Sequence, residues 1–563
     1  MLQIKNLTIT HKKDLRVILE DVNLVLNAGD RAVLIGEEGN GKSTLMKWLF
    51  DPEMVEDYVE WQGERVLSRE KMGYLPQELP AEEKPKTVYE YFSAAETFFE
   101  KSPRELAALA KDFGLPAEFY YSEQRMGSLS GGERVKAELM RILLAEPTAL
   151  LLDEPSNDID IETLEQLEKL ITGWKGIVLY ISHDETLIEN TANMIVHIEQ
   201  IRRKTKSRVT QVRMPYREYI AERQRLFDRQ EQQALSDRRE KKLRDERFRR
   251  IQEKVEANLT DPSHEMHDAL GRLAKKKMHA VKSLERRFER EDADMTEMPE
   301  QEEAIFFKLG GKESVMPAGK TVIEYEIEEL RAGEAQDTAG ADGARAAEAE
   351  NGAAAEKDAA AERNATAEKA AAAEPEGAVS RVLARNIFLR VRGPEKICII
   401  GKNGAGKTTL LRRIAAELLA RPDLHAEYMP QNYEELLDPK FLPEELLDES
   451  GEKEVRTRIR TYLGALKFTA DEMLHPVAEL SGGQKAKLLL LKLSLSGANV
   501  LILDEPTRNF SPLSGPVIRR LLREYPGAVI SVSHDRKFIR EVCDKVYTLT
   551  EEGLRAEDRT AAE

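Results

Sequence analysis

One set of five short motifs occurs twice in this chain, in the same order and with almost the same spacing. Each copy has a glycine-rich loop, a glutamine, a Leu-Ser-Gly-Gly segment, an Asp-Glu-Pro segment and a histidine. The last three motifs lie 351 residues apart between the copies, as Ser130 and Ser481 illustrate, and the glycine loops lie 365 residues apart, from Gly41 to Gly406. Repetition at a fixed spacing indicates a duplicated structural unit. The sequence therefore predicts two copies of one fold.

Both glycine loops have the pattern GxxxxGK[ST], in which glycines allow consecutive backbone N–H groups to point at phosphate oxygens. The lysine would neutralise the β- and γ-phosphates, and the hydroxyl residue after it would hold Mg²⁺. This pattern predicts binding of ATP and Mg²⁺. The candidate nucleotide-binding residues are Gly36, Glu37, Glu38, Gly39, Asn40, Gly41, Lys42, Ser43 and Thr44 in the first copy, and Gly401, Lys402, Asn403, Gly404, Ala405, Gly406, Lys407, Thr408 and Thr409 in the second.

An Asp-Glu pair follows a short apolar run in each copy, at 153–154 and at 504–505. Asp153 and Asp504 suit the Mg²⁺ shell, together with the hydroxyls of Ser43 and Thr408. The neighbouring carboxylates suit orientation or deprotonation of an attacking water. We therefore expect a catalytic role for Glu154 and Glu505.

A glutamine and a histidine complete each copy. Gln77 and Gln431 could couple the metal or the water to loop movement, and they gain weight from their matched positions. His183 and His534 each stand in the phrase Ser-His-Asp after an apolar run, which favours sensing of the γ-phosphate. All four are candidate catalytic residues.

Apolar runs before the functional loops, such as 32–35, 150–152 and 177–181, predict buried strands that deliver a functional residue at their C-terminal ends. Helices are expected to begin at Gly41 and at Gly131. The predicted fold class is therefore α/β. We expect a first catalytic domain at 1–205, a helical linker at 206–300 and a second catalytic domain at 301–563. An Ala/Glu-rich stretch at about 331–378 lacks large apolar residues and is predicted to be a disordered insertion.

The predicted linker is basic in an acidic chain. Residues 202–292 hold 27 Lys and Arg against 17 Asp and Glu, although the whole chain has a net charge of −17. Such local asymmetry favours a polyphosphate partner, and a solvated helical spacer is the alternative. Two helical arms are expected, separated by a break at 258–262 and arranged as an antiparallel hairpin.

Several classes are disfavoured by what the chain lacks. There is no apolar run long enough to span a membrane and no apolar segment of a signal peptide at the N-terminus. The two cysteines, Cys398 and Cys543, are expected to be buried thiols in a reducing cytosol, so we expect a cytoplasmic protein. They are also too few for the zinc or iron–sulfur sites of DNA-repair and ribosome-recycling ATPases.

The Leu-Ser-Gly-Gly segments, with the other four motifs, resemble the ATP-binding cassette superfamily, whose signature is LSGGQ. The resemblance covers both catalytic domains, and it implies two P-loop ATPase cassettes with a helical signature subdomain. It also implies that each ATP lies between the glycine loop of one cassette and the signature of the other. The signature residues so implicated are Ser130, Gly131, Gly132, Ser481, Gly482 and Gly483.

The second copy departs from the superfamily pattern, because Ser511 stands where an aspartate is usual. The aromatic residue that normally stacks on adenine is replaced by His11 in the first copy, and the insertion disrupts the same region of the second. We therefore expect the two sites to be unequal.

Two cassettes on one chain, separated by a basic helical linker, resemble the ABC-F class. That resemblance implies a ribosomal partner, with the linker contacting tRNA and rRNA through 238–250 and 275–282 and its tip at 258–266. Phosphate contacts of this kind position a protein without reading sequence. Both a translation factor and an antibiotic-resistance protein that protects the ribosome fit this class. The alternative is the ATPase subunit of a transporter, which would not need a long cationic linker.

Overall fold

In the computed structural model the described residues are 1–157, 159–201, 206–260, 276, 279, 282–283, 286–288, 309–311, 313–332, 381–448 and 451–557. The chain divides into two units, Met1–Gln211 with Glu302–Glu563, and Val212–Gln301. The first unit contains both copies of the motif set. The second unit contains most of the predicted linker.

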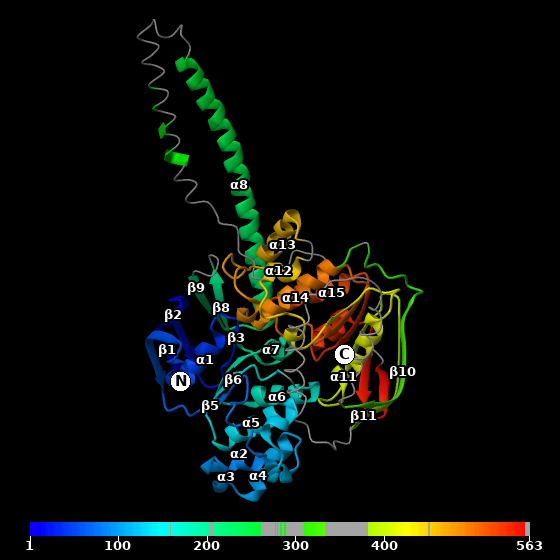
Figure 1. The fold of residues 1–563 in the computed structure, drawn as a ribbon. Helices are drawn as coiled ribbons and strands as arrows, with labels where there is room; N and C mark the ends of the chain where they lie inside the picture. The colour runs from blue at the N-terminus through cyan, green and yellow to red at the C-terminus, as the bar shows by residue number, and fades with distance from the viewer. Residues whose placement is uncertain are drawn as a thin grey trace, which may run out of the picture. The chain divides into compact units, whose positions relative to one another are not determined.

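A six-stranded sheet in the order β5-β6-β7-β3-β8-β9 forms the core of the first copy (Figure 1). Every residue of β6 and β7 is buried, as expected for central strands of a sheet that is covered on both faces. Strands β3, β5, β6, β7 and β8 pair in parallel. The strands are β3 (Arg31–Ile35), β5 (Met72–Leu75), β6 (Ala149–Asp153), β7 (Ile177–Ile181), β8 (Met194–Ile201) and β9 (Lys206–Val212). The α/β prediction is confirmed.

The second copy repeats this sheet in the order β13-β14-β15-β12-β16-β17. The central strands pair in parallel, and β17 closes the edge as an antiparallel strand. The buried Cys398 lies in this sheet, and Cys543 is also buried and unpaired. The strands are β12 (Lys396–Ile400), β13 (Ala426–Met429), β14 (Val500–Asp504), β15 (Ala528–Val532), β16 (Lys545–Thr550) and β17 (Gly553–Glu557).

A smaller antiparallel sheet accompanies each core. The first has the order β2-β1-β4, with β1 (Leu2–His11), β2 (Val17–Leu26) and β4 (Val59–Leu67). The second pairs β10 (Thr321–Arg331) with β11 (Val382–Arg392). Residue 331 therefore ends a strand instead of opening the Ala/Glu-rich insertion, because Arg331 pairs with Val382. The rest of the predicted insertion lies outside the described residues, between two strands whose ends are joined by the Ala332 N–H donating to the Arg381 carbonyl at 3.0 Å.

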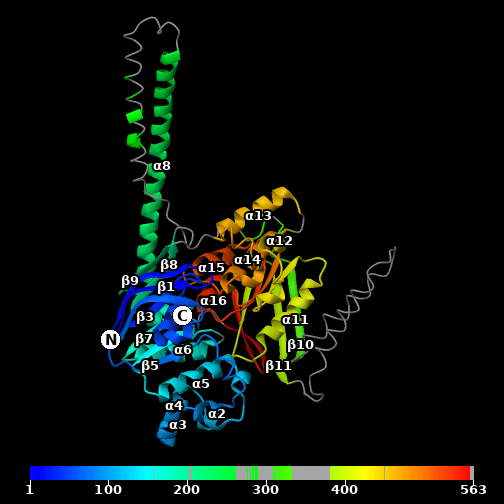
Figure 2. The same cartoon turned by 60° about the vertical axis from the view of Figure 1, so that its left-hand side comes forward.

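Helices flank both sheets. The first-copy helices α2, α3 and α4 gather beside α5, and α12 and α13 lie together near α14 (Figure 1, Figure 2). The first-copy helices are α1 (Lys42–Phe50), α2 (Val88–Ser93), α3 (Glu96–Glu100), α4 (Pro103–Asp112), α5 (Gly131–Leu144), α6 (Ile161–Gly173) and α7 (Glu185–Thr191). The second-copy helices are α11 (Lys407–Leu419), α12 (Pro443–Leu447), α13 (Lys453–Ala465), α14 (Gly482–Ser496), α15 (Gly515–Glu524) and α16 (Arg536–Val542). Short 3₁₀ turns occur at Pro52–Val55, Ala117–Tyr121, Met126–Ser128, Tyr433–Glu435 and Val477–Glu479.

The first nucleotide-loop helix begins one residue later than predicted. Gly41 precedes α1 with a φ of 86°, a left-handed conformation that glycine adopts without a Cβ penalty. Gly406 has the same place before α11, with a φ of 95°. The loop therefore ends at this glycine and the helix starts at the lysine.

The second unit is dominated by α8 (Tyr216–Thr260), which contains no glycine or proline and follows Pro215. The predicted break at 258–262 is wrong for 258–260, which are helical, because nothing before Asp261 forces the helix to stop. The remainder of the break, the tip to 266 and most of the second arm lie outside the described residues. Among the residues that the structure describes in both arms, Phe248 and Phe288 meet edge to face at 5.6 Å, and the Arg244 guanidinium lies 4.7 Å from the Phe288 ring centroid. Over the described part of the chain, no helix has the length and apolarity required to span a membrane.

Candidate active sites

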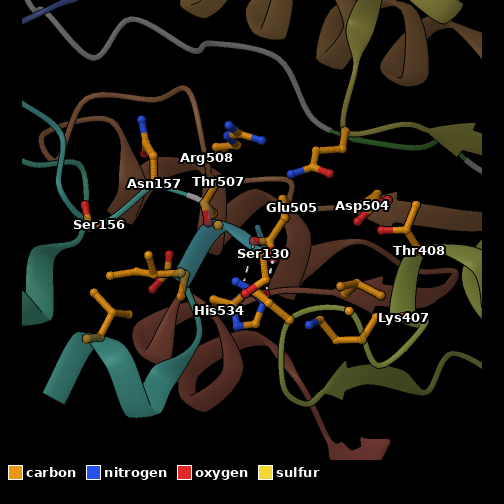
Figure 3. Close-up of a pocket in the computed structure, with 18 of the residues that line it drawn as sticks. Ser130, Ser156, Asn157, Lys407, Thr408, Asp504, Glu505, Thr507, Arg508 and His534 are labelled. Atoms are coloured by element: carbon orange, nitrogen blue, oxygen red, sulfur yellow. Dashed lines mark hydrogen bonds and ion pairs between the residues drawn. The ribbon is translucent and has the colours of Figure 1, made fainter. Parts of the chain in front are cut away.

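A cavity of about 530 Å³ adjoins the second glycine loop and is lined by both copies of the motif set (Figure 3). Second-copy residues on its wall are Asn403, Gly404, Gly406, Lys407, Thr408, Thr409, Gln431, Asp504, Glu505 and His534. The first copy contributes Ser130, Gly131, Arg134, Ser156, Asn157 and His183. One cavity thus brings together ten predicted site residues of the second copy and three of the first.

The loop lysines are held by their own loops. The Lys407 ammonium donates to the carbonyls of Gly401 at 2.8 Å and Lys402 at 3.0 Å. In the first copy Lys42 does the same with Gly36 and Glu37, both at 2.9 Å. Burial lowers the pKa of both ammonium groups, and the surrounding carboxylates oppose this shift. These carbonyls hold each lysine at the phosphate-binding loop.

The aspartates that end β6 and β14 lie beside the loop hydroxyls. The Ser43 hydroxyl donates to Asp153 Oδ1 at 3.0 Å. Asp504 lies beside the Thr408 hydroxyl (Figure 3), and among the described residues its carboxylate is less fully hydrogen-bonded than that of Asp153. Burial raises the pKa of each aspartate to about 6. A hydroxyl and a buried, under-satisfied carboxylate form an oxygen donor set that fits a divalent cation such as Mg²⁺.

The two glutamates share an unusual backbone conformation. Glu154 and Glu505 both have a φ of 52°, in the left-handed region that non-glycine residues rarely adopt. The backbone N–H of each donates to the end of the neighbouring strand, at Ile181 O (3.1 Å) and Val532 O (2.9 Å). Strain of this kind persists where the surrounding structure imposes it, most often at functional sites.

Glu154 is fully engaged by polar partners. Its carboxylate accepts from Gln77 Nε2 at 3.0 Å and from the Asn157 amide, and it contacts His183 Nε2 at 3.2 Å. Burial alone would raise its pKa, but His183, Lys42 and the hydrogen bond from Asn157 together outweigh burial and lower the pKa to about 2. Three first-copy residues predicted to be catalytic therefore form one hydrogen-bonded group.

Glu505 has a poorer environment. It accepts from the His534 backbone N–H at 3.2 Å, and the imidazole Nε2 stands 3.6 Å from its carboxylate. Burial, with repulsion from Asp504, raises the pKa of Glu505 to about 8. Burial and the nearby Lys407 lower the pKa of His534 to about 4. The histidines also differ, because His183 Nδ1 lies 2.7 Å from the Phe510 carbonyl, whereas His534 Nδ1 has no partner among the described residues.

A second cavity, of about 410 Å³, adjoins the first glycine loop. It brings Glu37, Glu38, Gly39 and Asn40 together with Ser481 and Gly483. Lys42, Ser43, Asp153 and Glu154 do not line it. The cavities beside the two glycine loops therefore differ in the residues that line them.

The carboxylates of Glu37 and Glu38 line this second cavity. The Glu38 carboxylate accepts from the Gly483 backbone N–H, and Glu37 Oε1 lies 3.1 Å from Lys487 Nζ. At the matched positions the second loop has Lys402 and Asn403. Sequence reasoning grouped all four with the nucleotide-binding residues and missed this difference, although the 365-residue offset exposes it.

Both Leu-Ser-Gly-Gly segments begin a helix in the same way. Ser130 and Ser481 each cap their helix by accepting from a backbone N–H three residues later at 3.3 Å, at Glu133 and Gln484. A capped helix N-terminus presents free N–H groups and a partial positive charge to an anion. The signature helices α5 and α14 are thus suited to bind phosphate.

The remaining predicted residues lie close to these cavities. Gly401, Lys402 and Ala405 line a neighbouring cavity behind the second loop, and Thr44 hydrogen-bonds Tyr58. Gly36, Gly41, Gly132 and Gly482 line neither site cavity, although Gly482 lies against Glu38.

His11, which stands where an adenine-stacking aromatic is usual, does not line the first-loop cavity; its ring contacts Asp14 at 2.9 Å. Arg16 lines that cavity instead, and its counterpart 365 residues later, Arg381, lines the cavity behind the second loop. Both arginines were missed by sequence reasoning, although the offset that matches the glycine loops would have found them.

Comparison with known proteins agrees with this geometry. Residues 19–157 and 384–508 match the ABC transporter domain family. The chain is 26% identical to the ribosome protection protein VmlR of Bacillus subtilis, over 96% of this chain and 85% of that protein. It is 27% identical to the tylosin resistance ATP-binding protein TlrC of Streptomyces fradiae, over 94% of each chain. It is also 27% identical to the ATP-binding protein Uup of Escherichia coli, over 93% of this chain and 76% of that protein.

The fold is similar to that of an archaeal ribosome recycling factor, which was solved in complex with a ribosomal stalk protein. The match covers 98% of this chain and 89% of the recycling factor, with a TM-score of 0.54 and 17% sequence identity. This likeness shows the tandem arrangement of the fold. Two matched nucleotide loops, two signature helices and end-to-end similarity to tandem ATP-binding proteins agree with one another. The protein therefore belongs to the ATP-binding cassette family, as a tandem-cassette ATPase of the ABC-F class.

Proposed function

We propose that this ATPase works on the ribosome, with Mg·ATP bound at two composite sites and its hydrolysis controlling engagement. The single observation that carries the proposal is the second-loop cavity, in which the glycine loop and Asp-Glu pair of one cassette face the signature helix of the other. The ribosomal role is supported by the ribosome protection protein VmlR, which aligns with 96% of this chain.

Each site would use the same division of labour. Lys42 and Lys407 would neutralise phosphate oxygens, and the N-terminus of the opposite signature helix would bind the γ-phosphate. Ser43 with Asp153, and Thr408 with Asp504, would hold Mg²⁺, which would neutralise phosphate charge during transfer. Glu154 and Glu505 would orient the attacking water. Gln77 and Gln431, with His183 and His534, would couple the phosphate to closure of the two cassettes.

The basic linker would contact RNA. In α8 the side chains of Arg238, Arg239, Lys242, Arg247 and Arg250 are exposed, and in the second arm Lys276 and Lys282 are exposed as well. Phosphate contacts by such a row of cations bind without reading sequence and weaken as salt rises. The contact of Phe248 with Phe288 supports an antiparallel hairpin at about 206–300. The tip of this hairpin would point towards tRNA, and the protein would act in the cytoplasm.

Ribosome binding can be tested directly. The Glu154→Gln, Glu505→Gln double variant with ATP is expected to co-sediment with purified ribosomes, because the cassettes close but do not hydrolyse. Adding Arg238→Glu, Arg239→Glu, Arg247→Glu and Arg250→Glu should reduce the pelleted fraction at least tenfold.

A matched control reverses four exposed cations outside α8, at Lys13, Lys175, Arg520 and Arg523, and should pellet like the parent. Loss of pelleting in both sets would indicate that only net charge matters. Failure of the parent itself to pellet would favour the transporter-subunit alternative. Drug susceptibility of cells with and without the protein would separate a resistance protein from a translation factor.

A further inference from the structure

A buried ion-pair network joins the two cassettes away from the nucleotide cavities. Arg519 on α15 forms a two-pronged contact with Glu185 on α7, with Nη1–Oε1 at 2.6 Å and Nη2–Oε2 at 3.3 Å. Only 3% of Arg519 and 6% of Glu185 is exposed. A desolvated, two-pronged Arg–carboxylate contact has strict geometry and tolerates loss of a partner poorly.

Two further cations of the second cassette extend the network. Lys537 Nζ on α16 lies 2.9 Å from Glu185 Oε2 and 2.6 Å from Glu189 Oε1. Arg536 bonds Glu168 on α6 and stands 3.6 Å from the Asp184 carboxylate. In the contacts between the cassettes all the carboxylates belong to the first cassette and all the cations to the second, and Arg519 also donates to Glu541 of its own cassette, with Nε–Oε2 at 2.8 Å.

The duplication makes this division informative. With the 351-residue offset that matches the signature, Asp-Glu-Pro and histidine motifs, Glu168 corresponds to Arg519 and Glu185 to Arg536. Glu189 corresponds to Arg540. Helix α7 at Glu185–Thr191 and helix α16 at Arg536–Val542 occupy matched ranges. Three positions that began as equivalents in the two copies therefore carry opposite charges.

The space around Glu185 fits only this arrangement. A Cβ at Gly515 would lie 2.3 Å from Glu185 Oε1, so the carboxylate packs against bare backbone. The matched first-cassette residue is Leu164, which is buried. The pocket that receives the glutamate thus exists in the second cassette alone.

We infer that these matched positions form a recognition surface whose charges allow the first cassette to pair with the second cassette. The same charges prevent the first cassette from pairing with another first cassette. Two first cassettes would bring Glu185 of one chain against Glu168 of the other, because Glu168 is the counterpart of Arg519. Two second cassettes would oppose Arg519, Arg536 and Lys537. Like charges that meet at a desolvated interface are strongly unfavourable, so repulsion excludes the wrong pairs while attraction selects the right one. The inference rests on the proposed pairing of the cassettes.

Complementation between two full-length variants tests the inference. Variant A carries Glu168→Arg, Glu185→Arg and Glu189→Arg, so both of its cassettes are basic at the interface. Variant B carries Arg519→Glu, Arg536→Glu and Lys537→Glu, so both are acidic. Each variant alone should lose at least tenfold in ATPase rate and remain monomeric in sedimentation velocity.

Mixed at equal concentration, the first cassette of B and the second cassette of A retain every native contact of the network. The mixture should form a heterodimer and recover at least fivefold in ATPase rate over either variant alone. The matched control Arg520→Glu reverses an exposed charge on α15; it should keep the wild-type rate and show no gain on mixing.

Two results would overturn the inference. One is near wild-type ATPase in either variant alone. The other is a mixture of folded variants, verified by circular dichroism and melting, that neither associates nor recovers activity. If the triple variants do not fold, the single variants Glu168→Arg and Arg536→Glu can be purified separately and then mixed. They test the same complementation at a contact that is only partly buried. These assays contain no ribosomes, so a failure of ribosome binding leaves their outcome unchanged.

Discussion

The substitution Glu505→Gln is expected to raise the unfolding temperature of the nucleotide-free protein at pH 8, whereas Glu154→Gln should lower it. Burial and Asp504 raise the pKa of Glu505 to about 8, from an ordinary value of 4.5. The folded protein therefore holds a proton that the unfolded chain has already released. Stability falls as pH rises from 4.5 towards 8, and the neutral amide removes this penalty.

Glu154 has the opposite linkage. Its pKa is lowered to about 2 from 4.5, because His183, Lys42 and Asn157 together outweigh burial. The ionised carboxylate stabilises the folded state above pH 4.5, and this contribution is lost only as pH falls towards 2. At about 1.4 kcal/mol per pKa unit, the effect is on the order of 5 kcal/mol for Glu505 and on the order of 3 kcal/mol for Glu154. The same substitution at these two matched glutamates is thus expected to change the stability of the protein in opposite directions.

The measurement is calorimetric unfolding of both variants in chelator and without nucleotide, from pH 5 to pH 8. The advantage of Glu505→Gln should grow across this range, while Glu154→Gln should show no such growing advantage. Glu60→Gln, an exposed change on β4, should follow the wild type throughout. A pH-independent difference for Glu505→Gln, or equal losses in both variants, would contradict the assignment of their environments.

The core of each cassette could be predicted from sequence because its strands leave no alternative. Runs such as 149–153 and 177–181 are apolar at almost every position, which fits a strand buried on both faces. The motif residues then follow at the strand ends. Duplication strengthened each assignment, since a lone glutamine or histidine would have carried little weight.

The errors arose where local signals are weak. Asn258 and Thr260 have poor helix propensity, but propensity is a small term that a 45-residue helix overrides. Strand β10 continues to Arg331 because its partner is supplied from beyond the insertion, at Val382. Contacts such as Glu38 with Gly483, which are 445 residues apart, cannot be read from spacing at all. The identity of both residues was visible, but their juxtaposition needed the fold.

Replacing the first-loop carboxylates with their second-loop counterparts, Glu37→Lys and Glu38→Asn, is expected to tighten ATP binding at the first site at least tenfold. In the folded protein the Glu38 carboxylate already accepts from the Gly483 N–H at the start of signature helix α14. That helix N-terminus is where a γ-phosphate would bind, so the nucleotide must displace an internal anion. The carboxylate also repels the incoming phosphate, and a tenfold change corresponds to about 1.4 kcal/mol.

Calorimetric titration with ATP in a Lys407→Met background, which silences the second site, isolates the first. The reciprocal changes Lys402→Glu and Asn403→Glu, in a Lys42→Met background, should weaken binding at the second site by a similar factor, because they install carboxylates opposite signature helix α5. An unchanged affinity in the first experiment would mean that Glu38 moves away at no cost when ATP arrives. Matched opposite shifts would instead establish that these two loop positions set the order in which the two sites fill. The second site, whose cavity is lined by Asn403, Lys407, Asp504 and Glu505, would load first, and the first site would load only when ATP outcompetes the protein's own carboxylate.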